Sequence, residues 1–265
     1  EIIDGLIATG LPVRDLDLDG DQITISEHEM TKDDAVWHVK TLIVLFLIIL
    51  GLSIPKIEAV QERSNFESLS IQYGGTGFIV SENHILTAGH VIDDCKKVTV
   101  TKDSQQIDSR TVAVSKMTDF GLLITNRRFE DVAKFRRQHI GAGKTILKYG
   151  YSLEEPTGGW TKGSITSQWE VSYGGRWDIN LLQYDALTHR GNSGGPILDQ
   201  SGHVVGIVVS SARPTLSDAV NSDAAELFLF TNFVMYEEAD STQDLNLHDV
   251  ARQARDFTVR VECWQ

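Results

Sequence analysis

The sequence predicts an all-β fold of two six-stranded antiparallel β-barrels, preceded by a hydrophobic helix and followed by a short extension. Two stretches, residues 66–130 and 140–236, contain short runs of alternating apolar and polar residues separated by turn residues, as antiparallel sheets do. Residues 41–55 instead hold the most apolar run of the chain. We expect residues 1–40 to be an acidic, loosely ordered segment and residues 237–265 to form the C-terminal extension.

The acidic character of the chain limits its partners. It carries 37 Asp and Glu residues against 24 Lys and Arg residues, a net charge of −13 over 265 residues. Such a surface repels nucleic acid, so we expect no nucleic-acid partner. Residues 15–21 alternate carboxylates as a calcium loop does, but Ser26 stands at the twelfth position, where such a loop needs a bidentate glutamate. A solvated acidic linker is the favoured interpretation, and the sequence predicts no metal and no cofactor.

Only two cysteines are present, Cys95 and Cys263. Cys95 has no partner nearby in the sequence, and no Asn-x-Ser/Thr glycosylation site occurs. We therefore expect a chain that does not rely on disulfides, which is typical of a reducing compartment.

The apolar run Thr41–Ile54 allows three interpretations. Fourteen helical residues span about 21 Å, less than the roughly 30 Å hydrocarbon core of a bilayer. The run could be a marginal membrane anchor, the hydrophobic region of a signal peptide that starts at Met30, or a buried core helix. We favour a membrane-associated helix, with residues 41–54 in contact with the membrane and Pro55 ending it.

The predicted strands follow the alternation of apolar residues and the turn signals between them. Those of the first barrel are Ser68–Tyr73, Gly77–Ser81, His84–Ala88, Lys97–Thr101, Thr111–Lys116 and Gly121–Thr125. Those of the second barrel are Thr145–Tyr149, Trp160–Trp169, Ile179–Leu187, Pro196–Asp199, His203–Ser210 and Leu227–Tyr236. The extension contains a possible helix with one apolar face around Val250, and then a short strand over Phe257–Val261.

Three polar residues at the ends of these strands are candidates for catalysis. Ser193 lies among glycines, which allow a sharp turn and a close approach of the backbone to a substrate. A serine hydroxyl needs a base to take its proton, and the base needs a third group to orient it. His90 follows a predicted strand and Asp119 precedes one, so both could lie on the rim of the first barrel. Each residue alone is a common turn or cap residue.

Together these motifs resemble those of the chymotrypsin-like serine protease family. Thr87-Ala-Gly-His90 matches the histidine motif of the family, Asp119-Phe-Gly-Leu-Leu its aspartate motif, and Gly191-Asn-Ser193-Gly-Gly-Pro its serine motif, in the same chain order. The resemblance covers about residues 66–236 and is strongest to the bacterial and viral branch, including the proteases of sobemoviruses and poleroviruses. It implies a chymotrypsin-like double barrel that hydrolyses polypeptides.

The resemblance also implies a role for each residue. Ser193 would be the nucleophile, His90 its general base, and Asp119 the group that holds the imidazole. The backbone N–H groups of Gly191 and Ser193 would form the oxyanion hole. Trypsin-type members carry an aspartate where this chain has Asn192, and that aspartate pairs with a newly cut N-terminus. Because Asn192 has no charge, we expect activity without such a cleavage.

Substrate-binding positions follow from the same resemblance. It places Leu187 at the base of the primary specificity pocket, Thr188 on its wall, and the stretch Val208–Ser211, with Ser210 and Ser211, along its side. No acid stands at the base, so we do not expect cleavage after Lys or Arg, and a small or medium apolar side chain fits best. The sobemovirus-like pattern favours Glu or Gln instead, and His189 could help to bind an acidic side chain, although an ordinary loop histidine is favoured.

Three hypotheses about function remain. The first is a membrane-tethered serine endopeptidase of the kind that processes a viral polyprotein, located at a host-cell membrane. It is suggested by the start at Glu1 rather than methionine, by the apolar run ahead of the protease-like region, and by Gln265 as a trace of self-cleavage. The alternative is a cellular or bacterial secreted or quality-control protease. The third is a catalytically silent binding module of the same fold.

Overall fold

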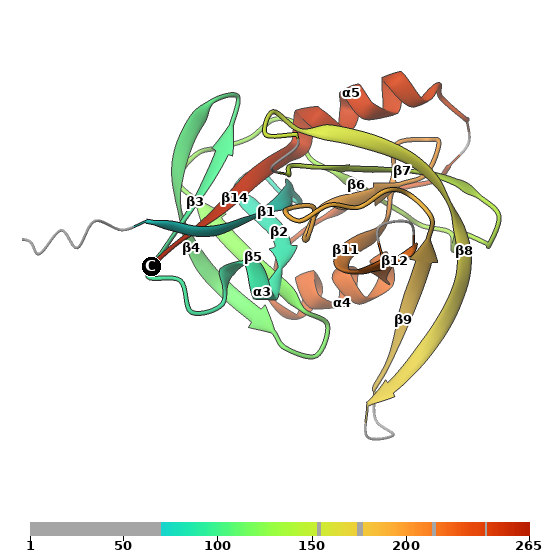
Figure 1. Cartoon of the computed structure of the whole chain (residues 1–265), viewed down its shortest axis with the longest axis horizontal. Helices are drawn as coiled ribbons and strands as arrows, with labels where there is room; N and C mark the ends of the chain where they lie inside the picture. The colour runs from blue at the N-terminus through green and yellow to red at the C-terminus, as the bar shows by residue number, and fades with distance from the viewer. Residues whose placement is uncertain (1–69, 153–154, 174–176, 214–215, 242) are drawn as a thin grey trace, which may run out of the picture. The chain divides into compact units, whose positions relative to one another are not determined.

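The computed structural model describes residues 70–265, except residues 153–154, 174–176, 214–215 and 242 (Figure 1). The predicted acidic segment and the predicted hydrophobic helix over residues 41–55 lie outside the described residues. Within the described part of the chain, no helix is long and apolar enough to cross a bilayer.

Strands dominate the described residues. The strands are β1 (Ile71–Ile79), β2 (His84–Ala88), β3 (Lys97–Lys102), β4 (Gln105–Ser115), β5 (Phe120–Thr125), β6 (Lys134–Arg136), β7 (Thr145–Gly150), β8 (Gly159–Tyr173), β9 (Trp177–Tyr184), β10 (Pro196–Leu198), β11 (Val204–Arg213), β12 (Leu216–Asn221), β13 (Glu237–Ala239) and β14 (Thr258–Trp264). The helices are α3 (Gly89–Ile92), α4 (Ser222–Thr231) and α5 (Leu247–Phe257). The predicted all-β class with two six-stranded antiparallel barrels is confirmed.

The first barrel closes in the order β1-β14-β3-β4-β5-β2. Its sixth strand, β14, comes from the C-terminal part of the chain and lies between β1 and β3 (Figure 1). All six strands were expected within residues 66–130, and the region of β1 was expected to form two strands, Ser68–Tyr73 and Gly77–Ser81. That split was wrong because the glycines in this strand do not form a turn. At Gly77 a Cβ atom would lie 2.9 Å from the side chain of Ile85, so the glycine lets two strands pack closely.

A disulfide joins Cys95 to Cys263, with their Cα atoms 5.4 Å apart. The expectation of a chain without disulfides is therefore wrong. The two residues are 168 positions apart in sequence, so spacing alone did not suggest the bond. They meet because β14 returns to the first barrel and pairs Cys263 with Val98, three residues beyond Cys95. The bond ties the segment after α3 to the C-terminal strand.

The second barrel is a ring of β7, β8, β9, β12, β11 and β10, closed by the pairing of β10 with β11. Two short strands, β6 and β13, extend the sheet beside β11, and both of these pairings are parallel. In Figure 1 the long hairpin of β8 and β9 projects beyond the rest of this barrel. The loop that contains Ser193 joins β9 to β10, so this barrel supplies the predicted nucleophile.

One predicted strand of the second barrel is a helix. Residues Leu227–Tyr236 were predicted as a strand, but Ser222–Thr231 form α4, and the sixth strand is β12. Asn221 ends β12 and caps the helix, since its side chain accepts a hydrogen bond from the Asp223 N–H. The apolar run misled the prediction, because Ala225 and Leu229 are buried four residues apart while the neighbouring large side chains on other faces of the helix are exposed.

The predicted helix of the extension is confirmed as α5. Its buried residues are Val250, Ala251, Ala254 and Phe257, a spacing that forms one helical face. Asn246 caps its first turn by accepting a hydrogen bond from the Asp249 N–H at 3.0 Å. The helix packs against β7 of the second barrel and leads directly into β14 of the first. The stretch over residues 237–265 is therefore part of the double barrel and not an appendage.

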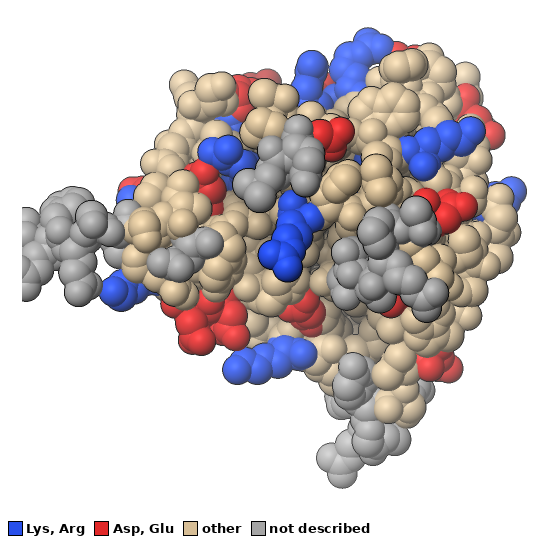
Figure 2. Space-filling model, in the orientation of Figure 1, with Lys and Arg blue, Asp and Glu red and all other residues tan. Residues whose placement is uncertain are grey.

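Surface charge on one face of the molecule is mixed. Figure 2 shows Lys and Arg side chains interspersed with Asp and Glu among uncharged residues. Over the described residues of this face there is no continuous basic patch of the kind that binds nucleic acid.

The disulfide should contribute measurably to stability. Replacing both Cys95 and Cys263 by serine removes a cross-link that restricts the unfolded chain, and we expect the free energy of unfolding to fall by about 2–5 kcal/mol. Guanidinium titration under oxidising conditions measures this change. Wild-type protein treated with reductant serves as the control and should match the double variant, whereas equal stability with and without reductant would contradict the prediction.

Candidate functional site

His90 and Asp119 come together because of strand pairing in the first barrel. β2 runs antiparallel to β5, and Ala88 at the end of β2 pairs with Phe120 at the start of β5. His90 lies two residues after this pair, in α3, and Asp119 lies one residue before it. The register of two strands thus places an imidazole and a carboxylate at the same rim of the barrel.

The carboxylate of Asp119 holds His90 with both of its oxygens. Oδ2 lies 2.6 Å from Nδ1 of the ring, and Oδ1 accepts a hydrogen bond from the His90 backbone N–H at 2.8 Å. The Asp119 carbonyl accepts a further bond from the Gly89 N–H at 2.7 Å, with Asp119 in the left-handed region at φ 54°. Since Nδ1 faces a carboxylate, it carries the proton, and Nε2 is left as the acceptor.

The same contact sets the charge state of the imidazole. The hydrogen bond to Asp119 raises the pKa of His90 above its ordinary 6.5; partial burial opposes this shift, and the negative charge of Asp119 adds to it. The His90 side chain remains half exposed. The ring is therefore open to a substrate on one side and anchored on the other.

The loop that carries Ser193 is attached to both barrels. The Ser193 carbonyl accepts a hydrogen bond from the Thr76 N–H on β1 at 2.8 Å. Gly194 N–H donates to the carbonyl of Val208 on β11 at 2.6 Å, and the Val208 N–H donates to Gly195 at 3.0 Å. Gly191 and Gly194 both have positive φ, at 99° and 83°, conformations that other residues rarely adopt. The loop is thus held in one shape between β1 and β11.

The serine loop lies against the end of β2. A Cβ atom on Gly194 would approach Ala88 N to 2.5 Å and Thr76 O to 2.2 Å, so the backbones touch here. Ala88 is two residues before His90, and the predicted triad therefore shares one rim. Among the described residues, neither His90 nor any other group hydrogen-bonds to Ser193 Oγ, and the backbone N–H groups of Gly191 and Ser193 are likewise without a bond. These unbonded groups are available to a substrate.

Asn192 is buried, and both polar atoms of its side chain make hydrogen bonds. Its Oδ1 accepts from Lys148 Nζ at 2.5 Å and from the His189 N–H at 2.8 Å, while its Nδ2 donates to the Tyr151 carbonyl at 3.0 Å. Asn192 stands between Gly191 and Ser193 in sequence. Its side chain thus anchors the turn from inside the second barrel.

The residues predicted to bind substrate surround this loop. Leu187 is 40% exposed, whereas Thr188 is buried with its hydroxyl bonded to Tyr184 and Ala186. His189 contributes its backbone N–H to Asn192. The buried Val208 belongs to β11, as do the backbones of Ser210 and Ser211, whose side chains lie outside the described part of the chain. Leu187, Thr188 and His189 are thus part of the β9–β10 loop that carries Ser193, and Val208 lies on β11, bonded to that loop.

A cavity of about 460 Å³ opens beside the serine loop. Gly191 lines it, and most of its exposed lining is apolar. The lining residues are Ile71, Tyr73, Gly74, Gly75, Tyr151, Ser152, Pro156, Arg190, Gly191, Arg260 and Glu262. This cavity could not be predicted from the sequence, because it is built from β1, β14 and two loops that are far apart in the chain.

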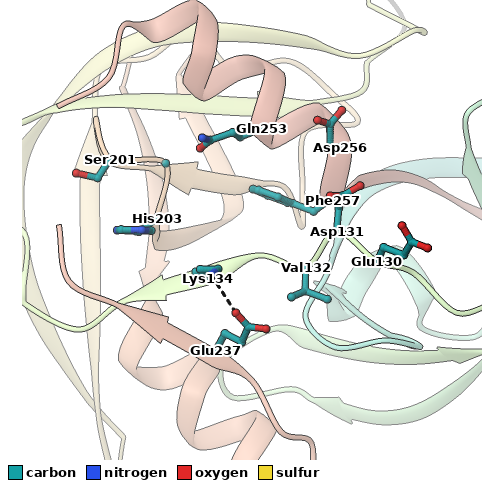
Figure 3. Close-up of a pocket in the computed structure, with 11 residues that line it drawn as sticks. Glu130, Asp131, Val132, Lys134, Ser201, His203, Glu237, Gln253, Asp256 and Phe257 are labelled. Carbon is teal, nitrogen blue, oxygen red and sulfur yellow. Dashed lines mark ion pairs between the residues drawn. The ribbon is translucent and has the colours of Figure 1, made fainter. Parts of the chain in front are cut away.

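A second cavity, of about 470 Å³, contains another serine, histidine and several acids (Figure 3). Its side chains do not form a nucleophile–base pair, because Ser201 Oγ donates to the Gln243 carbonyl and His203 Nδ1 lies 3.1 Å from Ser241 Oγ. Lys134 and Glu237 form an ion pair across it, at 3.2 Å. None of the predicted catalytic residues lines this cavity, and no group of three potential metal-ligating side chains occurs in the described part of the chain.

Two residues of the site were not singled out from the sequence. Thr76 Oγ1 donates to the Gly191 carbonyl at 2.7 Å and accepts from the Tyr151 N–H at 2.9 Å. Lys148 is fully buried on β7. A lysine within the otherwise apolar strand Thr145–Gly150 was the available signal, since lysine is almost never buried without a partner. Thr76 gave no comparable signal, because threonine is common in strands.

The sequence of the chain is similar to a known protein family and to several bacterial proteins. The model of the trypsin-like peptidase domain matches residues 75–207, half of the chain. The chain is 29% identical over 206 residues to the uncharacterized protein y4bJ of Sinorhizobium fredii, covering 71% of this chain and 32% of the relative. It is 31% identical over 147 residues to a Brucella suis protein named "Probable periplasmic serine endoprotease DegP-like". That similarity covers 53% of this chain and 28% of the relative. The chain thus spans about a third of the length of these relatives.

A solved structure shows the same fold. The Rv3671c protease from M. tuberculosis, in its active form, is similar with a TM-score of 0.55 at 21% sequence identity. The similarity covers 62% of this chain and 75% of that structure.

The contact at Gly194 should not tolerate a side chain. In the Gly194→Ala variant the new methyl group meets the Thr76 carbonyl, and φ stays positive, so we expect a loss of about 2–5 kcal/mol in unfolding free energy. Gly141→Ala is the matched control, because no atom lies within 4 Å of its Cβ position. Chemical denaturation of both variants measures the difference, and equal stability of the two would contradict the packing described for this loop.

Proposed function

Because the chain belongs to the trypsin-like peptidase domain family, we propose that it is a serine endopeptidase that hydrolyses polypeptides with Ser193, His90 and Asp119. The observation that carries the proposal is the His90–Asp119 pair, with Nδ1 bound at 2.6 Å and Nε2 free, on the rim where the serine loop lies. A carboxylate that orients an imidazole next to an unbonded serine is the arrangement that activates a hydroxyl nucleophile.

The reaction follows from these positions. Ser193 Oγ attacks the carbonyl carbon of the scissile bond while its proton passes to His90 Nε2. The negative oxygen of the tetrahedral intermediate accepts hydrogen bonds from the N–H groups of Gly191 and Ser193, each worth about 3–4 kcal/mol. The imidazolium then gives its proton to the leaving amine as the C–N bond breaks. Water attacks the acyl group by the same steps in reverse, and Ser193 regains its proton.

The serine and histidine must approach each other for this reaction. No hydrogen bond joins Ser193 Oγ to His90 among the described contacts, and such bonds often form only when substrate is bound. The backbone of the serine loop already lies against Ala88, two residues before His90. The Asp119 carboxylate, already bonded to Nδ1, stabilises the imidazolium that forms.

Substrate choice follows from the surroundings of the loop. With no acid at the predicted base, Leu187, we propose an uncharged side chain before the cleaved bond. The apolar cavity beside Gly191 would bind substrate residues that follow the cleaved bond, on the side of the leaving amine. Such a site suits exposed apolar segments of unfolded polypeptides.

The setting that we propose is that of a bacterial-type secreted or quality-control protease. The relatives support this alternative better than viral polyprotein processing, since one is a bacterial protein named for a periplasmic endoprotease. The Cys95–Cys263 disulfide also favours an oxidising compartment. In this proposal residues 41–54 direct the chain to the membrane.

Labelling with a fluorophosphonate tests the nucleophile. We expect wild-type protein to be labelled and to hydrolyse reduced casein, and Ser193→Ala to lose both activities. Ser201→Ala is the matched control from the second cavity and should be labelled like wild type. Labelling that persists in Ser193→Ala and disappears in Ser201→Ala would overturn the proposed site.

The pH dependence of labelling tests the base. His90 must be neutral to accept a proton, and its pKa is raised, so the rate should fall with decreasing pH through a value above 6.5. Asp119→Asn removes the negative charge, and the hydrogen bond to a carboxylate, that raise the pKa of His90. In this variant the acidic limb should move to lower pH, and the maximal rate should fall by up to about 10⁴-fold as the wrong tautomer forms. An acidic limb at the same pH in both proteins would contradict the assignment.

A further inference from the structure

Lys148 is a buried cation that the reaction above does not use. It lies on β7, is fully buried, and pairs with two uncharged residues, Thr161 on β8 and Ile197 on β10. Taking an ammonium group out of water costs several kcal/mol unless other groups replace its hydration. Its hydrogen bond to Asn192 Oδ1, at 2.5 Å, replaces part of this hydration.

The hydrogen bond between Lys148 and Asn192 joins β7 to the residue directly before Ser193 in the serine loop. Asn192 links Gly191 to Ser193: the Ser193 N–H belongs to the peptide unit that follows Asn192, and the Gly191 N–H lies one residue before it. A fixed Asn192 side chain therefore fixes the turn between these two unbonded N–H groups. The amide is also held by the His189 N–H and the Tyr151 carbonyl. Lys148 supplies the one charged partner, and charge-assisted hydrogen bonds are roughly twice as strong as neutral ones.

We propose that Lys148 is a positioning residue, whose ammonium group holds Asn192 and thereby keeps the N–H groups of Gly191 and Ser193 directed at the oxyanion. This inference rests on the proposed function. It explains how a chain with a neutral Asn192 organises its serine loop: the amine comes from the interior of the second barrel, and no newly cut N-terminus is needed.

The surroundings of Lys148 make its charge sensitive to pH. Burial lowers the pKa of Lys148 to about 8, and the negative charge of Glu155, in the turn after β7, acts in the opposite direction. Three charged groups of α5 and β14 also lie near this strand: Arg255, Asp256 and Arg260. They act on the pKa of Tyr149 and Tyr151 and are not among the causes of the shift at Lys148. As the pH rises through about 8 the amine loses its charge and becomes a weaker donor, so the hold on Asn192 relaxes.

The experiment compares two buried lysines. Lys148→Met keeps the shape of the side chain and removes the donor, whereas Lys102→Met removes an ammonium group that is also buried but pairs with the exposed Asp103 at 3.0 Å. For both variants and wild type, the maximal rate of fluorophosphonate labelling and the concentration giving half that rate are measured from pH 6 to 10, together with the melting temperature.

A positioning role predicts a specific pattern. In Lys148→Met the maximal rate should fall by about 10- to 100-fold, with the half-saturating concentration nearly unchanged, because the oxyanion contacts act in the transition state. The decline that wild type shows above about pH 8 should be absent in this variant. Its melting temperature should stay close to that of wild type, because relief of the buried charge offsets the lost hydrogen bond, and Asn192 Oδ1 keeps its bond from the His189 N–H. Lys102→Met should keep the wild-type rate.

Other results would overturn the inference. A maximal rate within twofold of wild type, or an alkaline decline retained in Lys148→Met, would show that the loop does not depend on this amine. If the maximal rate falls equally in Lys148→Met and Lys102→Met, and the melting temperature falls with it, the effect is a general structural one. If wild type itself is not labelled, the proposed function fails, and the inference fails with it; labelling of wild type and Lys148→Met alike removes the inference alone.

Discussion

The site depends on the hydrogen bonds that meet at Thr76. Its N–H donates to the Ser193 carbonyl, its carbonyl accepts from Thr87 Oγ1, and its own hydroxyl joins Gly191 and Tyr151. These partners belong to β2, the end of β7 and the serine loop, so one buried residue connects the first barrel to the second. This junction joins the β1 and β2 strands of the first barrel directly to the loop that carries Ser193.

The local parts of this arrangement could be predicted from sequence. His90, Asp119 and Ser193 follow from three short motifs, and strands such as His84–Ala88 follow from alternation and turn residues, because both signals lie within a few neighbouring positions. The double barrel followed from the resemblance that those motifs carry. Each of these inferences required only residues close together in the chain.

Features that depend on distant pairing could not be predicted. The return of β14 to the first barrel and the disulfide of Cys263 result from a register between segments more than 150 residues apart. The helix α4 was taken for a strand because a short apolar run fits either period, and its cap at Asn221 decides between them. The buried partner of Lys148 was hidden for the same reason, since only folding brings β7 next to the serine loop.

The position of β14 also has a consequence for synthesis. A ribosome delivers the chain from the N-terminus, and early domains commonly fold while later ones are still being made. Here the first barrel lacks its sixth strand, β14, until residues 258–264 have emerged, which is after every strand of the second barrel. The nascent chain therefore cannot close the first barrel, or complete the cavity that Arg260 and Glu262 line, until its other half exists, and the two halves mature together.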